Sequence, residues 1–96
     1  MIAERFTFQV KPGKWDKAVK LAKEGKKNVW PFISSRIYTV WFGPMQTIVF
    51  ELEFKDMADH DKKWEKLNAK KKWGTWVAKW QELIAVHGTH ESWGLD

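Results

Sequence analysis

The 96-residue chain contains no cysteine, which excludes disulfide bonds and thiolate chemistry of any kind, nucleophilic or metal-binding. It contains no internal repeat, low-complexity segment or interdomain linker. No apolar run approaches the roughly 20 residues that span a bilayer, and the N-terminus lacks the layout of a signal peptide. These absences predict a single domain over residues 1–96, located in the cytoplasm and without a membrane partner.

Arginine is also scarce, although the chain is basic. Seventeen lysines and arginines against twelve acidic residues give a net charge of +5, which favours weak attraction to anionic surfaces. The lysines at residues 70–72 lie beside indoles, an arrangement that can bind single-stranded nucleic acid. However, the only arginines are Arg5 and Arg36, and no known nucleic-acid motif is present. We therefore expect no nucleic-acid partner.

Periodicity predicts the secondary structure. Alternating apolar residues between turn signals predict strands over residues 1–10, 36–42, 47–54 and 89–95. Helical spacing predicts helices over 14–27, 57–67 and 73–87, with Asp56 as the N-cap of the second and Gly88 ending the third. The order β-α-β-β-α(α)-β predicts an α+β, ferredoxin-like fold, a four-stranded antiparallel sheet with helices on one face. One face of the third helix carries Trp73, Trp76, Val77, Trp80, Leu83, Ile84 and His87.

The predicted sheet has one covered and one open face. Its third strand directs Ile48, Phe50, Leu52 and Phe54 toward the helices. A half-apolar open face favours coverage by a second copy of the chain, so a homodimer is expected. Ion pairs between Arg5 and the glutamates are favoured there over acid–base catalysis. The expected open-face residues are Arg5, Thr7, Gln9, Tyr38, Thr47, Val49, Glu51 and Glu53.

Three stretches resemble NIPSNAP-type proteins. They are residues 4–14 (ERFTFQVKPGK), 35–38 (SRIY) and 42–54 (FGPMQTIVFELEF), and the order of elements is kept across most of the chain. This resemblance implies the dimeric α+β-barrel type of fold, in which two ferredoxin-like sheets face each other. It implies little about activity, because one fold hosts many functions.

Some relatives in that wider group degrade haem or oxidise quinols. The haem-degrading branch uses an asparagine on the first strand together with a tryptophan and a histidine on the helices. Trp64 falls where that tryptophan is expected, but the first strand offers Gln9 in place of asparagine. The third helix offers Trp76 and Val77 where a histidine is needed. We therefore expect no cofactor.

Two segments, residues 28–33 and 70–76, differ from the polar sequence expected in such proteins and are typical of a redesigned chain. The apolar loop residues either tuck under the sheet edge or form an exposed anchor, since aromatic residues dominate interface hot spots. The leading hypothesis is a non-catalytic protein-interaction module, a redesigned scaffold that presents an aromatic and basic surface to a protein partner. Its expected partner-binding residues are Trp30, Phe32, Ile33, Lys72 and Trp73.

The alternative hypothesis is a small-ligand enzyme or carrier of the haem or quinol monooxygenase type, using a cavity between sheet and helices. No nucleophile or cofactor loop is recognisable, and His87 and His90 are separated by Gly88 without an obvious third ligand. We therefore predict no catalytic residues and no metal site, and the balance favours interaction over catalysis. The expected pocket residues are Arg5, Tyr38, Glu51, Glu53 and Trp64.

Overall fold

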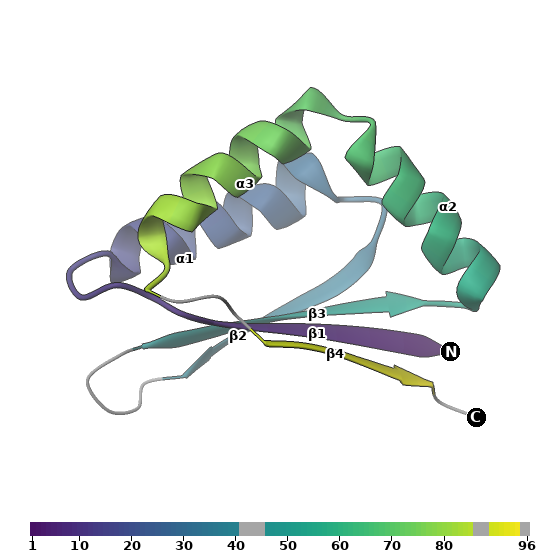
Figure 1. The fold of residues 1–96 in the computed structure, drawn as a ribbon, viewed down its shortest axis with the longest axis horizontal. Coiled ribbons are helices and arrows are strands. Elements are labelled where there is room, and N and C mark those ends of the chain that lie inside the picture. The colour runs from purple at the N-terminus through teal and green to yellow at the C-terminus, as the bar shows by residue number, and fades with distance from the viewer. Residues whose placement is uncertain (41–45, 86–88, 95–96) are drawn as a thin grey trace.

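A computed structural model of the protein describes residues 1–40, 46–85 and 89–94. Helices lie on one face of a twisted sheet, with α1 and α3 packed together and α2 inclined beside them (Figure 1). This arrangement confirms the α+β, ferredoxin-like prediction. The elements in chain order are β1 (Ile2–Gln9), α1 (Trp15–Glu24), the π-helical turn η1 (Gly25–Val29), β2 (Ser34–Val40), β3 (Thr47–Phe54), α2 (Met57–Asn68), α3 (Lys71–Leu83) and β4 (Thr89–Gly94).

The sheet is antiparallel throughout, with strand order β2-β3-β1-β4. Phe6 of β1 lies opposite Phe50 of β3 and opposite His90 of β4, so these three positions share the face that the helices cover. Arg5 lies opposite Glu51 and therefore points to the open face. The register thus separates an aromatic face from a charged one.

The hydrophobic core lies between the covered face and the helices. Ile48, Phe50, Leu52 and Phe54 are all buried in it, which confirms the prediction for β3. The helices and the turn after α1 contribute the other large side chains, whose burial stabilises the domain by removing apolar surface from water. These are Trp15, Leu21, Val29, Trp30, Ile33, Leu67, Trp76 and Trp80.

Local hydrogen bonds explain where α2 begins. The Asp56 carboxylate accepts the backbone N–H of Asp59 at 2.8 Å, which confirms Asp56 as the N-cap. In return the Asp59 carboxylate accepts the backbone N–H of Lys55 at 2.9 Å and pairs with Lys63 Nζ at 3.2 Å. These contacts lower the pKa of Asp59, the backbone hydrogen bond from Lys55 being the largest cause.

The third helix is shorter than predicted. It ends at Leu83, and Ile84 has the extended backbone angles φ −96° and ψ 145° and pairs with Val10 in an isolated β-bridge. The N–H of Lys11 donates to the Leu83 carbonyl at 2.9 Å, so the segment that follows β1 takes the carbonyl that a longer helix would use. The predicted positions of His87 and Gly88 lie outside the described residues. Among the described helices, none is long and apolar enough to cross a bilayer.

The first helix extends beyond its predicted end through a π turn. Residues 28 and 29, expected in a loop, belong to η1, and the N–H of Trp30 donates to the carbonyl of Gly25 at 2.9 Å. This i→i+5 bond is the π-helical pattern. The turn brings the Trp30 indole against Gly25 and beneath the helices.

Candidate functional site

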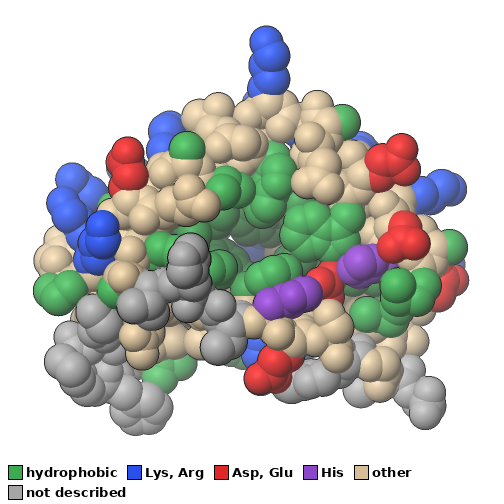
Figure 2. Space-filling model, in the orientation of Figure 1, with side chains coloured by type: hydrophobic (Ala, Val, Ile, Leu, Met, Phe, Trp, Pro, Cys, Tyr) green, Lys and Arg blue, Asp and Glu red, His purple; other side chains and the backbone are tan. Residues whose placement is uncertain are grey.

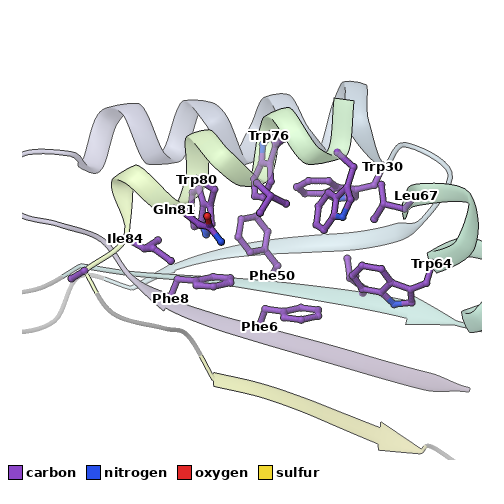
Figure 3. Close-up of a pocket in the computed structure, with 14 residues that line it drawn as sticks. Phe6, Phe8, Trp30, Phe50, Trp64, Leu67, Trp76, Trp80, Gln81 and Ile84 are labelled. Atoms are coloured by element: carbon purple, nitrogen blue, oxygen red, sulfur yellow. The ribbon is translucent and has the colours of Figure 1, made fainter. Parts of the chain in front are cut away.

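A cavity of about 780 Å³ lies between the covered face of the sheet and the helices. The space-filling view in Figure 2 shows a hollow lined by hydrophobic side chains between helices and sheet. Figure 3 shows the side chains of α3 and of the sheet converging on this space from opposite sides. Its walls are mostly aromatic, and the aromatic residues are Phe6, Phe8, Trp30, Phe50, Trp64, Trp73, Trp76 and Trp80.

The helical wall of the cavity is a row of stacked indoles. Trp73 and Trp76 are parallel within 6° at 5.8 Å between ring centroids, and Trp76 and Trp80 are parallel within 12° at 5.3 Å. Their i, i+3, i+7 spacing places them on one face of α3. Trp30 packs edge-on against Trp76 at 4.8 Å, and Phe50 of the sheet packs edge-on against Trp80 at 5.2 Å. The wall therefore presents flat, mutually braced rings.

Only some of the indole N–H groups around this cavity donate a hydrogen bond within the described part of the chain. Trp76 Nε1 donates to the Leu21 carbonyl at 2.9 Å and ties α3 to α1. Trp64 Nε1 donates to Glu4 Oε1 at 2.6 Å. The N–H groups of Trp30 and Trp80 are buried and find no acceptor within the part of the chain that the structure describes.

A buried carboxylate lies beside the cavity. Glu4 of β1 is only 3% exposed, and its Oε1 is 2.5 Å from His60 Nε2 of α2 while its Oε2 is 2.6 Å from His90 Nε2 of β4. The His90 ring stacks on Phe6 at 4.4 Å, and both Phe6 and Trp64 line the cavity. In Figure 2 the histidine side chains, in purple, lie at the edge of the hollow. Three elements thus meet at one carboxylate.

The contacts of His60 favour its protonated form. Its Nδ1 is 3.0 Å from Asp61 Oδ1 and its Nε2 faces Glu4, so both ring nitrogens meet carboxylate oxygens. A neutral imidazole has only one N–H to donate, whereas the imidazolium ion has two. Burial lowers the pKa of His60, but the hydrogen bond to Asp61 and the charge and hydrogen bond of Glu4 outweigh it and raise the pKa above its usual value.

The structure brings two of the five residues expected to bind a partner into contact, because the Trp30 and Trp73 rings pack edge-on at 6.0 Å between centroids. Trp30 and Ile33 are 4% and 3% exposed, so their expected exposure is wrong: the π turn folds Trp30 inward against Trp76. The half-buried Trp73 lines the cavity, and Lys72 is exposed. Phe32 is partly buried below Lys66 and Lys70, whose Nζ atoms are each 4.5 Å from its ring centroid.

Of the residues expected around a pocket, Trp64 lines the cavity and the other four do not. Arg5, Tyr38, Glu51 and Glu53 lie on the open face, because strand alternation directs them away from the helices. The cavity assignment of these four is therefore wrong, whereas their assignment to the open face is confirmed. The predicted ion pairing is also confirmed for Arg5 and Glu51, because Arg5 Nη2 lies 2.6 Å from Glu51 Oε2.

Sequence reasoning missed Glu4. Strict alternation with Phe6 and Phe8 places Glu4 on the covered face, a signal that its charge obscured. A buried carboxylate requires polar partners, and the four-residue spacing of His60 and Trp64 places both on one side of α2. Those two side chains supply the partners, together with His90 from the last strand.

The described residues do not fit a haem group. No histidine is among the described residues that line the cavity, while the side chains of His60 and His90 engage Glu4. Within residues 1–40, 46–85 and 89–94, no group of three or more histidine and carboxylate side chains is arranged to hold a metal ion.

The sequence profile of the NIPSNAP family matches residues 3–93. The chain belongs to the NIPSNAP family. An uncharacterized NIPSNAP domain protein from Burkholderia xenovorans has 19% identity and a TM-score of 0.83, over 100% of this chain and 95% of that chain. A NIPSNAP family protein of unknown function from Agrobacterium tumefaciens has 22% identity and a TM-score of 0.75, over 97% and 86% of the two chains.

The NIPSNAP chain is also similar to the solved structure of an antibiotic biosynthesis monooxygenase, with 18% identity and a TM-score of 0.76 over 100% of this chain and 99% of that chain. At such identities the likenesses show a shared fold. No curated protein matches the sequence.

Proposed function

We propose that this NIPSNAP protein binds a flat, largely apolar small molecule in the cavity between its sheet and helices. The aromatic lining of the 780 Å³ cavity is the observation that carries this proposal. Ligand cavities typically have about 300–1,000 Å³ and are lined mostly by hydrophobic and aromatic side chains with few polar groups. Parallel indoles on α3 and phenyl rings on the sheet offer flat faces on which a planar ligand stacks.

The burial of the aromatic side chains supports this proposal over a protein-interaction surface. An interaction hot spot needs contiguous exposed anchors, but Trp30 and Ile33 are in the core and Trp73 faces the cavity. Only Lys72 and part of Phe32 remain outside, and a lysine with one half-covered ring is a weak anchor. The same aromatic residues that suggest a docking patch in the sequence therefore support a small-molecule site in the fold.

Carrying a ligand is favoured over transforming it. The polar cluster at the cavity edge is internally paired, because Glu4 accepts one hydrogen bond from Trp64 and contacts both His60 and His90. The similarity to an antibiotic biosynthesis monooxygenase supports small-molecule use of this fold. We restrict the proposal to binding, since the aromatic walls supply flat contacts and no nucleophile.

The test is equilibrium dialysis with the planar hydrocarbon fluorene. Wild-type protein should bind it saturably at micromolar concentration. Val77→Phe, which adds bulk to the cavity wall, should weaken binding about tenfold or more. Ala78→Phe adds the same side chain at the neighbouring exposed position of α3 and should leave binding unchanged. Absence of saturable binding to the wild-type protein, or equal effects of the two variants, would contradict the proposal.

A further inference from the structure

A second hollow, of about 390 Å³, lies between α3 and the segment formed by α1 and η1, and we call it the lysine groove. Its buried lining residues are Leu21, Val29 and Trp76, so its base is apolar. Among the described residues only Trp76 also lines the aromatic cavity, so the groove is a separate site. Its exposed lining residues are polar, and they are Glu24, Asn28, Lys71, Lys72, Thr75 and Lys79.

The three lysines of the groove have no carboxylate partner. Within the described chain none of Lys71, Lys72 and Lys79 forms an ion pair, whereas Lys63 of α2 pairs with Asp59 at 3.2 Å. Glu24 is the single acidic residue of the lining, so three ammonium groups against one carboxylate leave a net charge of +2. Like charges without counter-charges repel each other, and an anion that binds between them relieves this repulsion.

The excess positive charge of the chain is concentrated in the elements that form the groove. Residues 15–29 and 70–83 contain both of its walls and hold nine lysines and three acidic residues, a net charge of +6. The complete chain carries only +5. The field of the protein therefore attracts an anion to these helices more strongly than to the rest of the surface.

The charge of the groove matches a phosphate monoester better than other common anions. A phosphate monoester carries about −1.5 to −2 at pH 7, close to the charge of the groove, whereas a carboxylate or sulfate ester carries one negative charge. Its oxygens accept hydrogen bonds, and the lysine ammonium groups, the Asn28 amide and the Thr75 hydroxyl can donate them.

The rest of the lining favours a small soluble molecule over a membrane surface. The apolar base can bury a short carbon skeleton, and a volume of 390 Å³ lies in the range of small-ligand sites, about 300–1,000 Å³. Helices that bind membranes insert exposed apolar side chains into the lipid. Neither α1 nor α3 has a large hydrophobic side chain among the exposed ones that the structure describes.

We propose that the lysine groove binds a small soluble phosphate monoester, whose phosphate group pairs with the lysines of the groove and whose carbon skeleton packs on Leu21, Val29 and Trp76. This anion site lies beyond the proposed function of the aromatic cavity and does not depend on it.

Hexyl phosphate and hexyl sulfate test the proposal, because they share an alkyl chain and differ in charge at pH 7. In titration calorimetry at low salt, wild-type protein should bind hexyl phosphate saturably and more tightly than hexyl sulfate. Lys72→Gln and Lys79→Gln should each weaken the binding of hexyl phosphate about two- to fivefold. Lys62→Gln removes the same charge from an exposed position of α2 outside the groove and should leave the affinity unchanged.

Spectra of the wild-type protein locate the site. In ¹H–¹⁵N spectra, hexyl phosphate should move the backbone amide signals of Asn28 and Thr75 and leave those of Phe6 and Phe8 in place. Absence of saturable binding, equal affinity for the two probes, or equal weakening by Lys62→Gln would overturn the proposal.

Cosedimentation with vesicles of phosphatidylcholine and phosphatidic acid in equal parts separates a soluble ligand from a lipid. Binding to these vesicles without binding of hexyl phosphate would overturn the proposal and assign the lysines to a membrane surface. None of these measurements involves fluorene, so failure of the lysine groove and failure of the proposed cavity function are distinguishable.

Discussion

Gly25 is the position where one added methyl group tests the packing of the cavity wall. A Cβ at this residue would lie 2.4 Å from Trp30 Cη2, 2.6 Å from Trp30 Cζ3 and 2.6 Å from Trp76 Nε1. Neither indole can yield easily. The two rings are perpendicular to each other at 4.8 Å, and the Trp76 N–H is held by the Leu21 carbonyl. Gly25→Ala must therefore displace the wall or the turn.

The change in unfolding free energy caused by Gly25→Ala follows from two opposing effects. Overpacking of a well-packed core costs about 1–3 kcal/mol. Replacing glycine by alanine in helical backbone contributes about 1 kcal/mol in the favourable direction. Gly74→Ala in α3 provides the control, because nothing lies within 4 Å of its added Cβ and only the favourable effect remains. The two variants should therefore differ by about 1–3 kcal/mol in unfolding free energy, with Gly74→Ala the more stable.

Urea unfolding followed by circular dichroism measures both free energies under the same conditions. In thermal scans the same difference should appear as about 4–8 °C in melting temperature for each kcal/mol. Gly25→Ala should also weaken fluorene binding, since displaced Trp30 and Trp76 rings alter the cavity. If Gly25→Ala stabilised the protein as much as Gly74→Ala, the close approach of the Trp30 indole to this turn would be refuted.

Three further predictions concern the polar contacts. Glu4→Leu removes the acceptor of the partly buried Trp64 N–H and should reduce the unfolding free energy by about 1–3 kcal/mol in urea titrations. An unchanged unfolding midpoint would contradict the role of this cluster in stability. The pKa of His60 is higher in the folded than in the unfolded state. The contribution of His60 to the unfolding free energy is therefore full below about pH 6.5 and is lost as pH rises through the raised pKa. The difference in unfolding free energy between wild type and His60→Gln should shrink between pH 6 and 9, and growth of this difference would contradict the prediction. We also propose a homodimer through the open face, where Tyr38 is 41% exposed. Light scattering should give twice the 11.4 kDa chain mass for the wild type and the monomer mass for Val49→Lys. A monomeric wild type would refute the proposed dimer.

Strand periodicity made the sheet predictable. Alternation in residues 47–54 directs Ile48 and Phe50 to the helices and Glu51 to the open face, and the observed register places all three accordingly. This signal is local and has a period of two, so it needs no knowledge of tertiary contacts. The Asp56 cap was predictable for the same reason, since a cap forms within one helical turn.

Tertiary contacts explain what was not predictable. Ile84 continues the helical pattern of α3, yet a bridge with Val10 draws it into extended backbone. Trp30 lies in the predicted loop directly before Pro31, and the π turn, in which the Trp30 N–H donates to the Gly25 carbonyl, places the indole inside. Both outcomes depend on partners distant in sequence or on a rare backbone pattern, and periodicity reports neither.

The cavity persists because its two sides are held by different forces. On one side the α3 indoles stack on each other and meet Trp30 and Phe50 edge-on. Flat ring faces therefore remain where interdigitated aliphatic side chains would fill the space. On the other side Glu4 ties α2 to β1 and β4 through polar contacts, at the end where α2 leans away from α3 (Figure 1). Loss of the carboxylate would free α2 to close onto the apolar rings, because burying them further is favourable. Binding capacity should therefore depend on Glu4 even though Glu4 is not among the residues that line the cavity.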